Sequence, residues 1–125
     1  MEDTDADEAD RGLGASRNRL EQLVDEAALD AFCAGTDVVL VEFYTNGCGI
    51  CQSMEPVLGN VARALDIRVG LINPRDDPGL IERFAVRSVP LLVLFVKGEP
   101  VARLEQGFVS GDELEAWIAE HAELS

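Results

Sequence analysis

The stretch VVLVEFYTNGCGICQSMEPVLGNVARAL, residues 38–65, decides the fold. Residues 38–44 are apolar except for Glu42, and a run of this length and composition predicts a buried strand. From residue 49 onward the apolar side chains recur at helical spacing, so we expect a helix over residues 49–65. Pro56 lies inside this helix and should bend it, because proline has no backbone N–H to donate. The stretch is therefore a strand that leads directly into a long helix.

The remaining chain continues the alternation of strands and helices. Further strands are predicted at residues 67–72, 90–96 and 100–106, and further helices at residues 77–85 and 110–123. Residues 97–99 form the turn of a hairpin. Residues 19–34 fit two interpretations, either one helix or a short edge strand at 20–24 followed by a helix that Asp25 caps. Either order predicts an α/β domain in which helices cover both faces of a sheet.

Composition limits the number of domains and the kinds of partner. The chain has 125 residues and is 47% hydrophobic, which suits one domain with a core of its own. Residues 1–18 are acidic and almost free of large apolar side chains, so we expect a disordered extension ahead of a domain at 19–125. With 24 Asp and Glu against 10 Lys and Arg, the net charge is −14. This charge disfavours binding to nucleic acid or to anionic membrane surfaces.

The same features predict where the protein works. The longest apolar run, residues 89–96, is far too short to cross a bilayer. The acidic N-terminus lacks the basic and apolar regions of a secretory signal, so we expect a cytoplasmic protein. The bases include a single lysine, Lys97, and an acidic chain with so little lysine is typical of organisms that accumulate salt. An acidic protein from a GC-rich genome is the alternative explanation.

Two cysteines stand where the first long strand gives way to its helix. A Cys-x-x-Cys motif at residues 48–51, beside a βαβ pattern, predicts a thiol–disulfide site. The N-terminus of a helix stabilises a thiolate at Cys48, and Cys51 lies one turn further in as the second thiol. Two inert thiols, or half of a zinc site, are the alternatives. The other candidate zinc ligands are Cys33 and His121 on separate elements, so we expect neither a metal nor an organic cofactor.

Several of these features together resemble the thioredoxin family over about residues 20–123. They are the strand VEFY at 41–44, the cysteine pair, Pro56 five residues later, Ser88-Val89-Pro90, the turn Lys97-Gly98-Glu99, and Gly107. The resemblance implies a thioredoxin fold, with a central mixed sheet of about four to five strands flanked by helices on both faces. It also implies that Pro90 follows a cis peptide bond.

The resemblance further implies a protein-disulfide reductase. In this interpretation Cys48 attacks the substrate disulfide, Cys51 resolves the mixed disulfide, and Glu42 accepts the proton of Cys51. The residues implied to contact the substrate are Gly47, Gly49, Ile50, Val89, Pro90 and Gly107. The implied partners are disulfide-containing proteins and a thioredoxin reductase or equivalent electron donor, and the implied state is a monomer. A binding or assembly module with little turnover, or a disulfide isomerase or oxidase of the same fold, are the alternatives.

Four positions depart from the family pattern. Gly47 stands where the family has tryptophan, and Ile50 stands where it has proline. Glu42 replaces the buried aspartate beneath the second cysteine, and Leu71 replaces the lysine that accompanies it. Because a buried carboxyl without a cationic partner favours its protonated form, we expect a raised pKa for Glu42.

Overall fold

The computed structural model describes residues 20–34 and 37–122. The strands are β1 (Leu20–Leu23), β2 (Val38–Phe43), β3 (Arg68–Ile72), β4 (Leu91–Val96) and β5 (Glu99–Leu104). The helices are α2 (Glu26–Ala34), α3 (Gly49–Leu65), α4 (Gly79–Arg83) and α5 (Gly111–Ala122), with a short 3₁₀ helix η1 (Pro74–Asp76). The strands form one sheet in the order β1-β3-β2-β4-β5, in which β1, β3 and β2 run parallel and β4 and β5 are antiparallel to their neighbours. The expected mixed sheet is confirmed, whereas the predicted extension at 1–18 lies outside the described residues.

The structure decides between the two interpretations of residues 19–34. Strand β1 pairs in parallel with β3, from Leu20 opposite Val69 to Leu23 opposite Ile72. Helix α2 then begins after Asp25, whose Oδ1 accepts a hydrogen bond from the N–H of Ala28 at 2.9 Å. The edge strand followed by a capped helix is therefore confirmed.

The segment after β3 differs from the single helix expected over residues 77–85. It contains η1 as well as α4, and α4 itself is shorter than expected. The η1 turn forms because the Asn73 side chain accepts a hydrogen bond from the N–H of Arg75 at 3.0 Å, and Pro74 suits the first position of a helix. Helix α4 ends at Arg83, and Ala85 has a φ of +51° that breaks the helical path.

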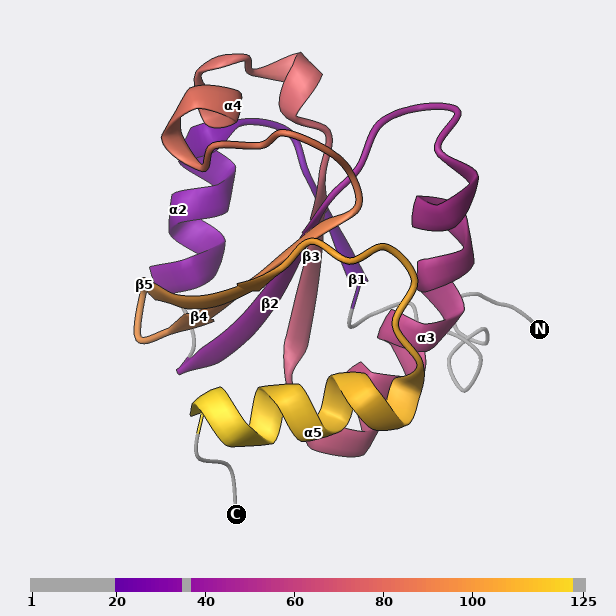
Figure 1. Ribbon diagram of the computed structural model, residues 1–125. Helices are drawn as coiled ribbons and strands as arrows, with labels where there is room; N and C mark the ends of the chain where they lie inside the picture. The colour runs from indigo at the N-terminus through magenta and orange to yellow at the C-terminus, as the bar shows by residue number, and fades with distance from the viewer. Residues whose placement is uncertain (1–19, 35–36, 123–125) are drawn as a thin grey trace, which may run out of the picture.

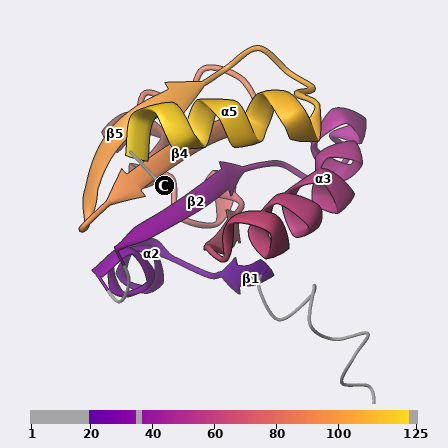
Figure 2. The ribbon, with the colours of Figure 1, turned by 90° about the horizontal axis from the view of Figure 1, so that it is seen from below.

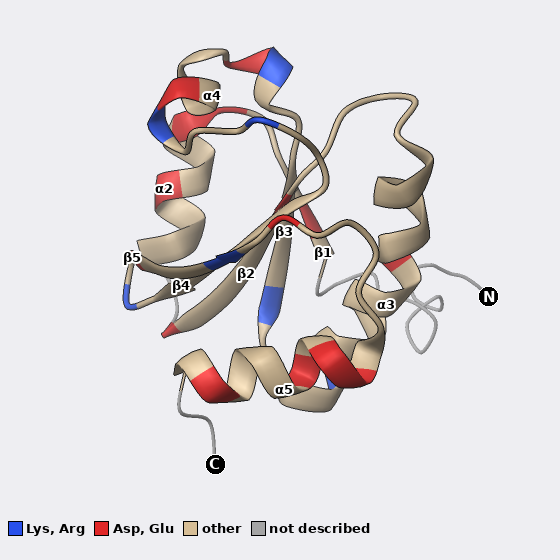
Figure 3. Cartoon of the chain, in the orientation of Figure 1, with Lys and Arg blue, Asp and Glu red and all other residues tan. Residues whose placement is uncertain are grey.

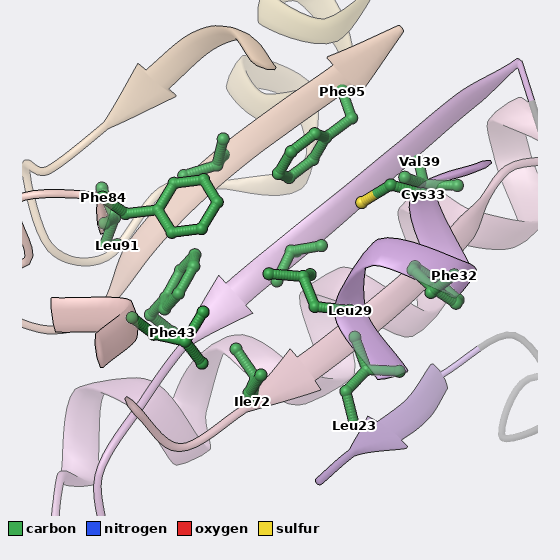
Figure 4. Close-up of a cluster of buried hydrophobic side chains, with 13 residues drawn as sticks. Leu23, Leu29, Phe32, Cys33, Val39, Phe43, Ile72, Phe84, Leu91 and Phe95 are labelled. Carbon is green, nitrogen blue, oxygen red and sulfur yellow. The ribbon is translucent and has the colours of Figure 1, made fainter. Parts of the chain in front are cut away.

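Helices cover both faces of the sheet, with α2 and α4 on one face and α3 and α5 on the other (Figures 1 and 2). The core on the α2 face contains Phe43, Phe84 and Phe95, whose rings are 5.2 and 6.0 Å apart in succession (Figure 4). Cys33 is buried in this core, 4% exposed, where it packs as a small apolar side chain. Burial, and to a lesser extent Asp30, raise the pKa of its thiol to about 11.

Close packing of side chains against β3 on the α2 face requires a glycine in that strand. A Cβ atom at Gly70 would lie 2.7 Å from Cδ1 of Leu23 and 3.0 Å from Cε2 of Phe32. Both of these side chains are buried, so neither can easily move aside. The absence of a side chain at Gly70 is what lets β1 and α2 pack closely on β3.

The opposite face holds the second core, formed mainly by α3 and α5. Side chains alternate along β2, so Leu40 and Glu42 point to this face while Val41 and Phe43 point to the other. Helix α5 begins with a reciprocal cap, in which the Ser110 Oγ accepts from the N–H of Glu113 at 3.2 Å and the Glu113 Oε1 accepts from the N–H of Ser110 at 3.3 Å. Within the described residues, no helix combines the length and the hydropathy needed to cross a bilayer.

Strand β5 forms one edge of the sheet and pairs irregularly with β4. The register shifts between Leu94 and Phe95, so that Leu94 faces Ala102 while Phe95 faces Pro100. Such a shift is typical of an edge strand that carries a proline, because proline cannot donate to the ladder. The turn between the two strands has positive φ values at Lys97 and Gly98, as expected for a tight hairpin.

Candidate active site

The two cysteines of the motif lie where β2 leads into α3, and they form a disulfide. Their Cα atoms are 5.3 Å apart. Cys48 is the N-cap residue of α3, and its Sγ accepts a hydrogen bond from the N–H of Cys51 at 3.1 Å. Cys48 is partly exposed, whereas Cys51 is 2% exposed. An external disulfide can therefore reach the sulfur of Cys48, while that of Cys51 is enclosed.

The start of α3 favours negative charge at Cys48. The amide groups of the first helical turn have no carbonyl partner within the helix, and the positive end of the helix dipole lies here. The N–H of Cys51 already points at the Cys48 sulfur and would donate to a thiolate in the same position. The geometry thus suits a nucleophilic thiolate at Cys48.

Gly47 precedes the motif in a conformation that a larger residue would not readily adopt. Its φ is +84°, in the left-handed region, and nothing lies within 4 Å of a Cβ built there. A tryptophan at this position would find room for its Cβ atom but would strain the backbone. The chain beside Cys48 is consequently open, and Ile50 within the motif is 50% exposed.

Glu42 is buried on the α3 face of the sheet, 1% exposed. Among the residues that the structure describes, neither of its carboxyl oxygens has a hydrogen-bond partner. In the sheet it stands opposite Leu71 of β3 and Leu92 of β4, so aliphatic residues flank it on both sides. Burial, followed by the negative charge of Glu55, raises the pKa of Glu42 from its ordinary 4.5 to about 8. The direction expected from the sequence is confirmed.

The loop before β4 lies beside the cysteine motif. The peptide bond between Val89 and Pro90 is cis, as the family resemblance implied. Val89 lines one cavity together with Thr45, whose carbonyl accepts a hydrogen bond from the N–H of Cys48 at 3.3 Å. Val89 is half-buried and Pro90 is buried. The structure therefore brings Val89 to the side of the Cys48 turn.

The loop between β5 and α5 is attached to the first half of α3. The N–H of Val109 donates to the Met54 Sδ at 3.4 Å, and Met54 lies three residues beyond Cys51. This loop contains Gly107, with a φ of +89°, and Phe108, which is 52% exposed. Neither Met54 nor Phe108 was expected from the sequence to have a part in the site. The signal in the sequence was that Phe108 is a large aromatic residue that lies outside every predicted strand and helix.

The candidate zinc ligands do not converge on the cysteine pair. Cys33 lies on α2 and His121 on α5, and these helices cover opposite faces of the sheet. The Nδ1 of His121 lies 2.9 Å from the carbonyl of Trp117, within its own helix. In the described part of the chain, no group of three or more His, Cys, Asp or Glu side chains is arranged to hold a metal ion.

Comparison with known proteins identifies the family. The thioredoxin family model matches residues 21–120. The thioredoxin of Chlamydia caviae is 34% identical over 88 residues, which are 70% of this chain and 85% of that protein. The thioredoxin of Alicyclobacillus acidocaldarius is 36% identical over 69% of this chain and 83% of its own length. A Synechocystis thioredoxin-like protein is 42% identical over 69 residues, which are 54% of this chain and 66% of that protein.

Solved structures agree with this result. A single-substitution mutant of the thioredoxin from Halobacterium salinarum superposes with a TM-score of 0.79 at 34% identity, covering 86% of this chain and 95% of that one. The oxidised mitochondrial thioredoxin 3 of Saccharomyces cerevisiae, at 23% identity, shares the fold with a TM-score of 0.72 over 84% of this chain and 98% of its own. With its mixed sheet, its disulfide at the start of α3 and its cis-proline loop, the chain belongs to the thioredoxin family.

Proposed function

We propose that the protein reduces disulfide bonds in other proteins by thiol–disulfide exchange through Cys48 and Cys51. The observation that carries this proposal is the position of the two sulfurs, one partly exposed at the cap of α3 and bonded to one that is buried. A nucleophile that substrates can reach, and a second thiol that only the first can reach, are the requirements of a two-step exchange.

The reaction starts from the reduced protein. The Cys48 thiolate attacks one sulfur of the substrate disulfide, the substrate S–S bond breaks, and the other substrate sulfur leaves as a thiolate. Cys51 then gives its proton to Glu42 and attacks the Cys48 sulfur. The Cys48–Cys51 bond forms, the mixed disulfide breaks, and the second substrate thiolate is released. Two electrons have passed to the substrate, and a separate reductase must return two electrons to the protein.

Glu42 sets the pH dependence of the second step. Only its ionised form can accept the Cys51 proton, and a pKa of about 8 means that the protonated form dominates at neutral pH. Resolution of the mixed disulfide should therefore accelerate as the pH rises toward about 8 and then level off.

The substrate lies on the surface around Cys48. This surface consists of Gly47, Gly49, Ile50, Val89 and Gly107, and Pro90, which is buried, follows Val89 in the chain. The half-exposed side chain of Ile50 supplies apolar contact area, and the backbone of Val89, beside the Cys48 turn, pairs with an extended substrate segment. The buried ring of Pro90 holds that backbone in place.

The protein acts as a monomer in a cytoplasm rich in salt, with residues 1–18 as an acidic extension of the domain. The support is its composition, with a net charge of −14 and a single lysine, together with the likeness to a thioredoxin from Halobacterium salinarum. Concentrated salt screens the mutual repulsion of the acidic side chains.

Reduction of insulin with dithiothreitol as electron source tests the function. The wild-type protein should accelerate reduction, and Cys48→Ser should not. Cys51→Ser should accumulate a mixed disulfide with insulin, because the resolving thiol is missing. Cys33→Ser is the matched control and should behave like the wild type. If the wild-type and Cys48→Ser proteins give the same rate, the protein is a binding module with little turnover rather than a reductase.

A further inference from the structure

A cavity of about 200 Å³ lies beside the Cys48 turn, between the cis-proline loop and the η1–α4 segment. Thr45 and Val89 form its wall on the side of the motif, and Arg75 and Arg87 are the two charged residues that line it. No acidic residue of the described chain lines it. In a protein with 24 acidic residues against 10 basic ones, a cavity lined by two arginines contrasts with the overall charge.

The charge of the two arginines is only partly neutralised. Among the described residues, Arg75 is exposed and forms no ion pair with an acidic side chain. The side chain of Arg87 is 75% exposed and pairs with Glu105 at 3.2 Å. Glu105 is shared with Arg103, whose Nε lies 2.9 Å from its carboxylate, so one negative charge faces two positive ones. Both charged side chains that line the cavity are therefore cationic, and Arg87 shares its one acidic partner with Arg103.

The basic side chains near the cavity differ from the purely acidic charge of α5. At η1 and α4 blue segments stand beside red ones, and the loop that follows α4 carries a blue segment, whereas α5 carries acidic residues and no Lys or Arg (Figure 3). The cavity with its two arginines lies at the end of the sheet where β2 passes into the cysteine motif, near the atoms that react.

The cavity matches a carboxylate-bearing side chain in chemistry as well as in charge. Its apolar lining accommodates a short aliphatic stem and consists of Pro74, Ile81, Val86 and Val89. The hydroxyl-bearing residues Thr45 and Ser88 line it too, and hydroxyl and guanidinium groups both donate hydrogen bonds to carboxylates. A side-chain amide of the same size could contact the apolar lining and the hydroxyl groups, but it carries no charge to pair with the arginines.

We infer that this cavity binds an aspartate or glutamate of the substrate protein, close in sequence to the cysteine that Cys48 attacks. The inference rests on the proposed function and adds its substrate class, which is proteins whose reactive disulfide has acidic neighbours. The hydrogen bond between Cys48 and Thr45 closes a turn, and such a turn spans less than about 7 Å. Since an extended segment advances about 3.3 Å per residue, the acidic residue lies about two to three positions from the substrate cysteine.

Matched peptides test the inference. Each peptide has one cysteine in a mixed disulfide with 5-thio-2-nitrobenzoate, and has Glu, Gln or Lys at the second and third positions on both sides of it. Release of the yellow thiolate by the reduced protein gives a second-order rate constant. This rate constant is divided by the rate constant for the reaction of the same peptide with dithiothreitol, which corrects for the intrinsic reactivity of each disulfide. The Glu peptide should react about fivefold faster than the Gln peptide at about 0.1 M KCl, and the Lys peptide more slowly than both.

Two double variants separate the cavity from the overall charge. Arg75→Gln/Arg87→Gln should bring the Glu peptide to the rate of the Gln peptide and leave the Gln peptide unchanged. Arg63→Gln/Lys97→Gln removes the same charge from residues that do not line the cavity, and should keep the preference. In about 1 M KCl, part of the preference should persist, because contact pairs are screened less than distant charges.

Each contrary result has a distinct meaning. Equal rates for the Glu and Gln peptides would overturn the inference and leave the reductase function standing, whereas no reaction with any peptide would overturn both. If the preference for the Glu peptide is lost equally in the control variant, or is abolished in about 1 M KCl, it arises from the long-range electrostatic field of the protein and not from the cavity. Glutathione disulfide is the alternative occupant. If glutathione disulfide reacts faster than the Glu peptide and its rate depends on Arg75 and Arg87 in the same way, the assignment to protein substrates is overturned.

Discussion

Glu42→Gln should stabilise the fold at neutral pH by an amount that depends on pH in a defined way. The folded protein holds the Glu42 proton with a pKa of about 8, against an ordinary 4.5 that applies when the chain is unfolded. At pH 7, which is about 2.5 units above the unfolded-state pKa, Glu42 is ionised in the unfolded chain but mostly protonated in the folded protein. At about 1.4 kcal/mol per unit, the titration of Glu42 lowers the free energy of unfolding by about 3 kcal/mol at that pH.

The direction of the pKa shift determines the pH range in which Glu42 lowers the stability of the fold. Because the pKa of Glu42 is raised in the folded protein, the contribution of its bound proton to stability is fully present below about pH 4.5. This contribution is lost as the pH rises toward about 8. Glutamine is uncharged and close in shape to the protonated acid. The two proteins should therefore be about equally stable near pH 4, differ by about 3 kcal/mol near pH 7, and differ by a constant and larger amount above pH 8.

Urea unfolding of the oxidised proteins at constant KCl, between about pH 4 and 9, measures this difference. Glu99→Gln is the control, because Glu99 is an exposed residue of β5 and its replacement removes the same charge. It separates relief of the general negative charge from relief of burial. Parallel stability curves for the wild type and Glu42→Gln across this range would refute the reasoning about Glu42.

Three further results are expected. Iodoacetamide near neutral pH should label reduced Cys48 before Cys33, whose buried thiol has a pKa of about 11, and peptide mapping that finds Cys33 labelled first would contradict the assignment of the nucleophile. The melting temperature should rise by several degrees between about 0.1 and 3 M KCl as the net charge of −14 is screened, and a flat or falling curve would contradict adaptation to salt. Gly70→Ala should lower the free energy of unfolding by about 1–3 kcal/mol because its Cβ would meet Leu23, whereas Gly111→Ala, with nothing within 4 Å of the new atom, should stay within about 0.5 kcal/mol in the same urea assay.

Local patterns in the sequence predicted the elements whose partners are close along the chain. Helix α3 was expected with the bounds that it has, because its apolar period is regular over the whole length of residues 49–65. The reciprocal cap of α5 is a feature of the same local kind, since Ser110 and Glu113 are only three residues apart. The raised pKa of Glu42 could be anticipated because an acid in an apolar strand has few ways to be solvated.

Features that depend on distant partners were harder to predict. The segment at Leu20–Leu23 has residues suited to a helix, and its pairing with β3, about fifty residues later, makes it a strand. The cis bond before Pro90 came from the family resemblance, because its local sequence also suits an ordinary strand start. The charged cavity was missed, since Arg75 and Arg87 belong to different segments that packing brings together.

The irregular edge strand has a consequence for solubility. Molar salt weakens charge repulsion, so charged residues alone protect an exposed sheet edge poorly against pairing with another molecule. Pro100 offers no N–H to an incoming strand, and the shift in register at Leu94 and Phe95 interrupts the regular spacing that such a strand would need. Both barriers lie in the hydrogen-bonding pattern of the backbone and do not depend on ionic strength. On the β5 side, the fold is protected from edge-to-edge aggregation by the shape of its backbone, under the same conditions in which its acidic surface protects it least.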